Sequence, residues 1–192
     1  MTGADGGSGE NLRSLRDRPF ELLQELEKRS RANAAGPAPE ASAGREWVGV
    51  AFRMGGETFL VAREETREVL GYPAAVTRIP GAKAWVKGLA NVRGQLLPMI
   101  DLRQLLGSGM TAAGRNTRVI VVNHREIPAA LMVDEVLGFR RFAEREFSAD
   151  PPPTVIRCDS YLAGAFRRGG EVWPVLSLKS LVESQSFLQA AS

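Results

Sequence analysis

The sequence has few of the side chains that most often carry enzyme chemistry. It contains one cysteine, Cys158, and one histidine, His124. A single cysteine excludes an intramolecular disulfide, and together the two residues are a poor inventory for a metal site. They are also the most economical catalytic pair, but Asp159 beside the thiol disfavours a thiolate. The sequence therefore predicts no enzyme, no metal and no cofactor.

Membrane segments, phosphate-binding loops and runs of like charge are also missing. No stretch approaches the ~20 apolar residues of a membrane helix, and the N-terminus lacks the basic and apolar regions of a signal peptide. The net charge of +3 is mild, and basic residues alternate with acidic ones, which is typical of a solvated surface. Neither G-x-x-x-x-G-K nor G-x-G-x-x-G occurs. We expect a cytoplasmic protein without direct membrane insertion and without nucleic acid as a partner.

What the sequence does contain is an internal repeat. Five residues of the stretch 86–106 recur 76 positions later (164 − 88): Gly88, Gly94, Pro98, Leu102 and Leu105 return as Gly164, Gly170, Pro174, Leu178 and Leu181. The run Glu68–Tyr72 likewise returns as Glu135–Phe139, at an offset of 67 (135 − 68). Such a repeat predicts two copies of one strand-rich unit. The alternative is chance matching of short apolar strings.

Apolar alternation and tight turns predict short strands throughout both copies. Residues 48–54 alternate with the period of a half-buried strand, and Gly55 and Gly56 then predict a hairpin turn. Pro98 lacks an N–H inside an apolar run, so its strand is expected to be an edge strand or to be bulged there. Many short strands between tight turns are typical of small barrels or a sandwich. We place the two copies at about 46–107 and 117–178.

The two ends of the chain are predicted to lie outside a β domain at 46–184. Pro19 suits the first turn of a helix over about 18–33, on which Phe20, Leu23 and Leu26 form a narrow apolar stripe. This stripe is expected to dock either on its own domain or on a partner. The residues after the helix, up to 45, predict a linker, and residues 185–192 predict a C-terminal tail.

An ordered set of motifs resembles the CheW family of chemotaxis coupling proteins, from Trp47 to about Glu183. The motifs that carry the resemblance are Phe52–Glu57, Arg67–Leu70, Thr77–Pro80, Val86–Gly94 and Leu97–Leu102. Within the family, Arg18–Glu21 and Val76–Lys83 are similar to the PilI type, which serves twitching motility.

The resemblance implies a mainly β fold with two SH3-like five-stranded barrels. It also implies a non-enzymatic adaptor, with two partners: the cytoplasmic tip of a methyl-accepting chemoreceptor and the regulatory domain of a CheA-type histidine kinase. Such an adaptor is recruited beneath the inner membrane by receptor arrays and controls type IV pili. The alternatives are a scaffold of a flagellar chemotaxis array and a generic protein-interaction double barrel. A nucleic-acid-binding double barrel would need stacking aromatics and a basic groove.

The same resemblance implies a partner-binding surface. Glu68 and Arg93 occupy the positions of a charged pair, and opposite charges on adjacent strands are expected to pair and to orient the surface. Gly88 and Asn91 flank it, while Val69 and Val136 are candidate apolar contacts. The alternative for Glu68 and Arg93 is a purely structural role in closing the first barrel.

Overall fold

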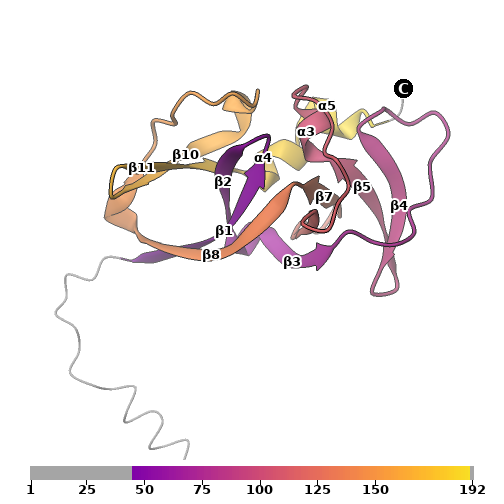
Figure 1. Cartoon of the computed structure of the whole chain (residues 1–192), viewed down its shortest axis with the longest axis horizontal. Coiled ribbons are helices and arrows are strands. Elements are labelled where there is room, and N and C mark those ends of the chain that lie inside the picture. The colour runs from indigo at the N-terminus through magenta and orange to yellow at the C-terminus, as the bar shows by residue number, and fades with distance from the viewer. Residues whose placement is uncertain (1–44, 191–192) are drawn as a thin grey trace, which may run out of the picture. The chain divides into compact units, whose positions relative to one another are not determined.

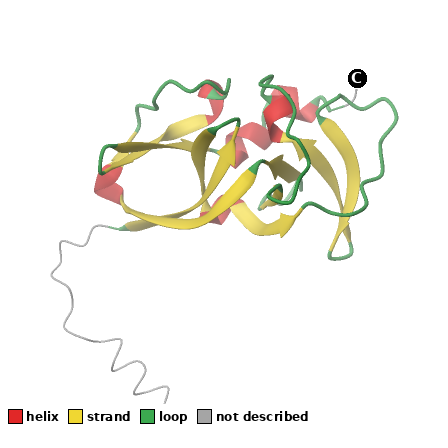
Figure 2. Cartoon of the chain, in the orientation of Figure 1, coloured by secondary structure: helices red, strands yellow, loops and turns green. Residues whose placement is uncertain are grey.

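The computed structural model describes residues 45–190, so the predicted helix at 18–33 lies outside the described residues. The described part is mainly β and forms two sheets (Figures 1 and 2). The six-stranded sheet has the order β8-β1-β2-β11-β10-β9, and the five-stranded sheet has the order β3-β6-β7-β5-β4. This confirms the predicted mainly β class with two sheet units. No helix among residues 45–190 is long and apolar enough to cross a membrane.

Short helical segments connect or follow the strands. The strands are β1 (Glu46–Met54), β2 (Glu57–Ala62), β3 (Thr66–Gly71), β4 (Val86–Val92), β5 (Gln95–Asp101), β6 (Arg118–Val122), β7 (Ala130–Val133), β8 (Glu135–Ala143), β9 (Phe147–Ser148), β10 (Leu162–Arg168) and β11 (Glu171–Leu176). The α-helices are α3 (Leu102–Leu105), α4 (Leu178–Val182) and α5 (Gln185–Leu188), and the 3-10 turns are η1 (Arg63–Glu65), η2 (Glu144–Glu146) and η3 (Asp159–Tyr161).

The sheets do not follow the two halves of the sequence. β1 and β2 pair with β8 and β11, which come from the second half. β6 and β7 pair with β3 and β5, which come from the first half. The predicted barrels at 46–107 and 117–178 are therefore wrong in their boundaries, because strand pairing exchanges the first two strands of each half.

The repeat is nevertheless present, in a circularly permuted form. Strands β3, β6, β7, β5 and β4 of one sheet occupy the same order as β8, β1, β2, β11 and β10 of the other. The first copy is thus the continuous stretch from β3 to β7, whereas the second runs from β8 to β11 and is completed by β1 and β2. The two sequence offsets, 67 and 76, both match residues of β3–β5 with residues of β8–β11. Each of these segments is continuous in the sequence, so the repeat can be detected there.

The central strands are buried on both faces. On β6, Val119 and Val121 pack in the interior of the five-stranded sheet, whereas Ile120 and Val122 belong to a larger cluster between the sheets. This shared core also contains Phe52 of β1 and residues of α4, and Figure 1 shows α4 between the two sheets. Burial on both faces explains why β6 is a continuous apolar run without alternation.

Pro98 lies in a strand that is neither an edge strand nor bulged at that position. β5 pairs with β4 on one side and with β7 on the other, but the β7 pairing begins only at Met99. Pro98 is opposite Leu89, whose N–H and carbonyl bond instead to Thr77, at N–O distances of 2.7 and 2.8 Å. The missing N–H therefore interrupts neither ladder. The bulge lies in β4, between Val86 and Gly88.

The predicted C-terminal tail is part of the fold as far as the structure describes it. Ser184 caps α5 by accepting a hydrogen bond from the N–H of Phe187. The Phe187 ring is 5% exposed, belongs to the shared core and stacks on Trp85 with a centroid distance of 6.0 Å. The domain boundary predicted at residue 184 is therefore too early.

We expect the shared core to make the two sheets unfold together. Ile120→Ala removes apolar volume from this cluster and should lower the free energy of unfolding by about 2–5 kcal/mol. Trp85 reports on the side of the five-stranded sheet, and Trp47 and Trp173 pack on the six-stranded sheet. Single-tryptophan versions should show coincident urea transitions, and Ile120→Ala should shift both midpoints equally.

Leu96→Ala is the matched control, because the Leu96 side chain is 64% exposed and its loss should change stability by less than about 0.5 kcal/mol. Two separate transitions, or a shift of only the Trp85 signal in Ile120→Ala, would contradict a common core.

Candidate functional site

The five-stranded sheet is closed by side chains where β3 meets the β4–β5 turn. Glu68 Oε2 accepts a hydrogen bond from Arg93 Nε at 2.7 Å, and Gln95 Oε1 accepts one from Arg67 at 2.8 Å. β3 and β4 are the two outer strands of this sheet. The predicted Glu68–Arg93 pair is thus present, but it joins opposite ends of the sheet rather than adjacent strands, which explains how it closes the barrel.

The turn that carries Arg93 has an unusual backbone. Arg93 has φ +50° and Gly94 has φ +85°, and Arg93 is the one non-glycine residue with positive φ among residues 45–190. Two successive left-handed residues form a type I′ hairpin turn, and Asn91 Oδ1 stabilises it by accepting the Gly94 N–H at 2.8 Å. The Arg93 side chain is 76% exposed and that of Glu68 is 19% exposed. The ion pair itself contributes only about 0–1 kcal/mol to stability. Because the Arg93 side chain is largely exposed, much of its guanidinium remains available to a partner.

A groove lies between the two barrels, along β3 and β8. Its walls include Glu68, Val69 and Val136, and its volume is about 270 Å³. β3 and β8 are equivalent strands of the two copies, and among the described strands each has a ladder partner on one side only. We call this feature the β3–β8 groove. It brings together three of the six predicted site residues. Arg93 lies in the turn that is bonded to Glu68, and Asn91 lies near the end of β4, just before this turn.

Phe139 is a groove residue that the sequence prediction missed. It lines the β3–β8 groove with its side chain 61% exposed. The repeat identifies Phe139 as the counterpart of Tyr72, but an apolar residue in a strand pattern is normally assigned to the core. The pairing of Phe139 with Val50 of β1 places Phe139 on the face of the six-stranded sheet that lines the groove, and this long-range pairing is not visible in the sequence.

Gly88 is buried in β4 and does not line the β3–β8 groove. It has φ +139°, and a Cβ atom there would lie 2.2 Å from the carbonyl oxygen of Thr77. Thr77 forms a bridge to Leu89 on the outer edge of β4. The structure therefore gives Gly88 a backbone role, namely to let the Thr77 segment cover this edge.

The candidate catalytic residues do not form a dyad. Cys158 is buried, its Sγ lies 3.5 Å from Thr154 Oγ1, and burial raises the pKa of its thiol. His124 Nε2 lies 3.2 Å from Glu183 Oε1, and its Nδ1 accepts the N–H of Ile127 at 3.1 Å. Within the part of the chain that the structure describes, no three side chains are grouped to hold a metal ion.

Comparison with known proteins agrees with this geometry. The model of the CheW-like domain matches residues 48–186, from β1 into α5. The chain belongs to the CheW-like family. It is 41% identical over 173 residues to the protein PilI of Pseudomonas aeruginosa, covering 90% of this chain and 96% of that protein. It is 28% identical to the chemotaxis protein CheW of Klebsiella aerogenes, covering 79% of this chain and 92% of that protein.

A solved structure supports the family fold. The scaffolding protein TtCheW from Thermoanaerobacter tengcongensis superposes with a TM-score of 0.65 at 25% identity, covering 74% of this chain and 96% of that chain. The resemblance found in the sequence motifs is therefore confirmed. As a CheW-like protein, the chain is a scaffold or coupling protein and not an enzyme.

We expect Gly88→Ala to destabilise the fold by about 3 kcal/mol, because the substitution adds a backbone clash with Thr77 to the strain of a positive φ. Urea unfolding measures this loss. The control is Gly71→Ala, where a Cβ would have no neighbour within 4 Å and φ is ordinary, so the change should stay within about 0.5 kcal/mol. Equal stability of Gly88→Ala and wild type would contradict the covering of β4 by the Thr77 segment.

Proposed function

We propose that this CheW-like scaffold couples a methyl-accepting chemoreceptor to a CheA-type histidine kinase and thereby controls type IV pilus motility. The observation that carries the proposal is the β3–β8 groove with the exposed Glu68–Arg93 pair beside it. The identity to PilI of P. aeruginosa over nearly the whole chain supports the pilus system. A flagellar chemotaxis array is the second candidate, supported by the lower identity to CheW of K. aerogenes.

The β3–β8 groove has the character of a helix-binding site. Its lining includes the apolar side chains of Val50, Val69 and Val136 and the charged side chains of Arg67 and Glu68. An amphipathic helix binds such a groove with its apolar face, while charges at the rim select the correct partner. The helical cytoplasmic tip of a receptor is the partner that we assign to this groove.

The β4–β5 turn offers a second surface at the end of the five-stranded barrel. Arg93 and Leu96 are both largely exposed there, and arginine is enriched in protein interfaces relative to the rest of the surface. The regulatory domain of a CheA-type kinase is the partner that we assign to the turn, packing barrel against barrel. Separate surfaces allow the scaffold to hold both partners at once, in the cytoplasm beneath the inner membrane.

Titration calorimetry tests both assignments with the full chain, a receptor cytoplasmic hairpin and a kinase regulatory domain from the same organism. Val136→Asp puts a charge into the groove and should weaken receptor binding at least tenfold. Arg93→Glu should weaken kinase binding at least tenfold. The matched control is Arg141→Glu, which breaks an exposed ion pair with Glu46 on the other sheet and should leave both affinities unchanged.

The double reversal Glu68→Arg with Arg93→Glu separates a structural role from a recognition role. The exchanged charges can still pair and close the barrel, so the fold should be retained by circular dichroism. If the kinase regulatory domain recognises these two charges, the double variant should still bind it weakly. Restored binding would instead assign the pair to barrel closure alone, and a folded wild type that binds neither partner would overturn the proposed coupling.

A further inference from the structure

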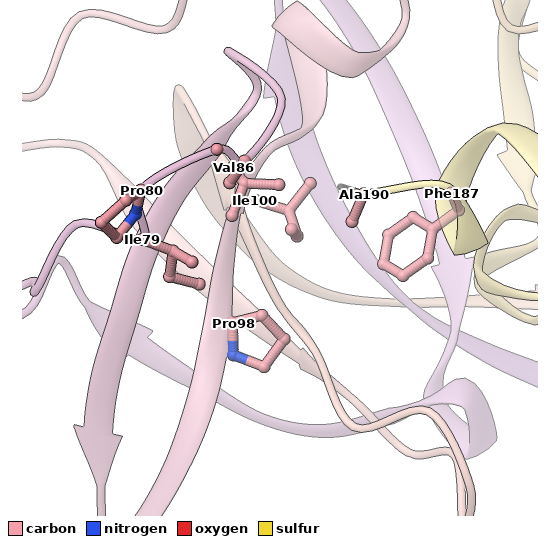
Figure 3. Close-up of a pocket in the computed structure, with 9 residues that line it drawn as sticks. Ile79, Pro80, Val86, Pro98, Ile100, Phe187 and Ala190 are labelled. Carbon is pink, nitrogen blue, oxygen red and sulfur yellow. The ribbon is translucent and has the colours of Figure 1, made fainter. Parts of the chain in front are cut away.

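An apolar pocket lies on the five-stranded side, away from the β3–β8 groove. Figure 3 shows Ile79 and Phe187 facing the same hollow from opposite sides, with Pro98 between them. Val86 and Ile100 also line it. Its volume is about 230 Å³, and it shares no lining residue with the β3–β8 groove. A ligand of this pocket therefore does not compete for the surfaces assigned above.

The size and the walls of the pocket fit a protein side chain better than a metabolite. Pockets for drug-sized ligands hold about 300–1,000 Å³ and contain a few polar groups that orient the ligand. This pocket is smaller, and its lining side chains are all apolar. One or two large apolar side chains of a peptide segment would fill it without leaving a polar group unpaired.

Positive charge adjoins the pocket on one side. A neighbouring hollow of about 390 Å³ shares Ile79 and Val86 with it and is lined by Arg78, Lys83 and Lys87. Lys87 is already neutralised by the buried carboxylate of Asp101, at an N–O distance of 3.3 Å.

Within the described residues, Arg78 and Lys83 have no carboxylate partner. Both are exposed, and neither forms an ion pair within residues 45–190. The sequence contains no Asp or Glu between Glu68 and Asp101, and none from 184 to 190. The hollow therefore presents two cations that attract carboxylates.

The pocket is also held in shape by the fold. Thr77 is bonded to Leu89 of β4, and the N–H of Lys83 donates to the carbonyl of Ala190 at 2.9 Å. Phe187 is buried and stacks on Trp85. A preformed pocket loses little conformational entropy on binding, which favours affinity.

We propose that this pocket and its basic hollow form a further docking site for an acidic, apolar segment of another protein. A large apolar side chain of that segment enters between Ile79 and Phe187, and its neighbouring carboxylates pair with Arg78 and Lys83. The inference stands on the pocket alone and does not depend on the receptor or kinase assignments.

Fluorescence anisotropy with the full chain tests the proposal. The probe is a labelled peptide with a Leu-Phe pair flanked by two Glu on each side, and its counterpart carries Gln in place of Glu. We expect the Glu peptide to bind at least tenfold more tightly at 50 mM salt, and the difference to shrink at 500 mM because exposed charges are screened. The double variant Arg78→Glu with Lys83→Glu should remove the preference for the Glu peptide.

Two further variants locate the peptide. Ile79→Asn should weaken binding of both peptides, and since Ile79 is 38% exposed the fold should tolerate it, which circular dichroism checks. Arg141→Glu, a charge reversal on the other sheet, should change neither affinity. Absence of binding at millimolar peptide, equal binding of the two peptides to the wild type, a preference for the Glu peptide that persists in the Arg78→Glu, Lys83→Glu variant, or undiminished binding to Ile79→Asn would each overturn the docking site.

Discussion

The fold depends on burying a second face of its central strands. β1 and β6 each carry large apolar side chains on both faces, so that one face fills a barrel and the other must be covered from outside. Each barrel covers the outer face of the other, with α4 and Phe187 completing the same cluster. Either barrel alone would expose this apolar face to water, which is unfavourable. This constraint brings β3 and β8 alongside each other and thereby creates the groove between them.

The two copies share a backbone plan but differ in their surface charges. Both β3 and β8 contain a Glu-Val-Leu-Gly run. Glu68 bonds across the barrel to Arg93, whereas Glu135 bonds at 2.8 Å to Arg53 on the neighbouring strand. In the second copy, Glu146 accepts a hydrogen bond from Arg168, which lowers the pKa of Glu146 to about 2. The paired barrels thus present unlike ends, which suits the proposed coupling of two different partners.

Local features of the fold could be predicted from the sequence, whereas long-range pairing could not. The predicted hairpin at Gly55-Gly56 is confirmed, and it was predictable because a two-residue turn depends on neighbouring residues. The pairing of β1 with β8 joins segments far apart in the chain, and strands buried on both faces lack the alternation that would orient them. The same limit applies to the site: Glu68, Val69 and Val136 do meet in one groove, whereas the burial of Gly88 and the exposure of Phe139 depend on distant neighbours.

Rigid surfaces have a consequence for how such a scaffold acts. The β3–β8 groove is formed by strands fixed to the shared core, the Arg93 turn is held by Asn91 and Glu68, and the Ile79 pocket is fixed by backbone bonds of Thr77 and Lys83. A ligand shifts a conformational equilibrium only by its differential affinity for two states, and the described contacts define one well-packed state. Under the proposed function, the chain therefore acts by holding its partners at a fixed spacing, and the change of state belongs to the partners.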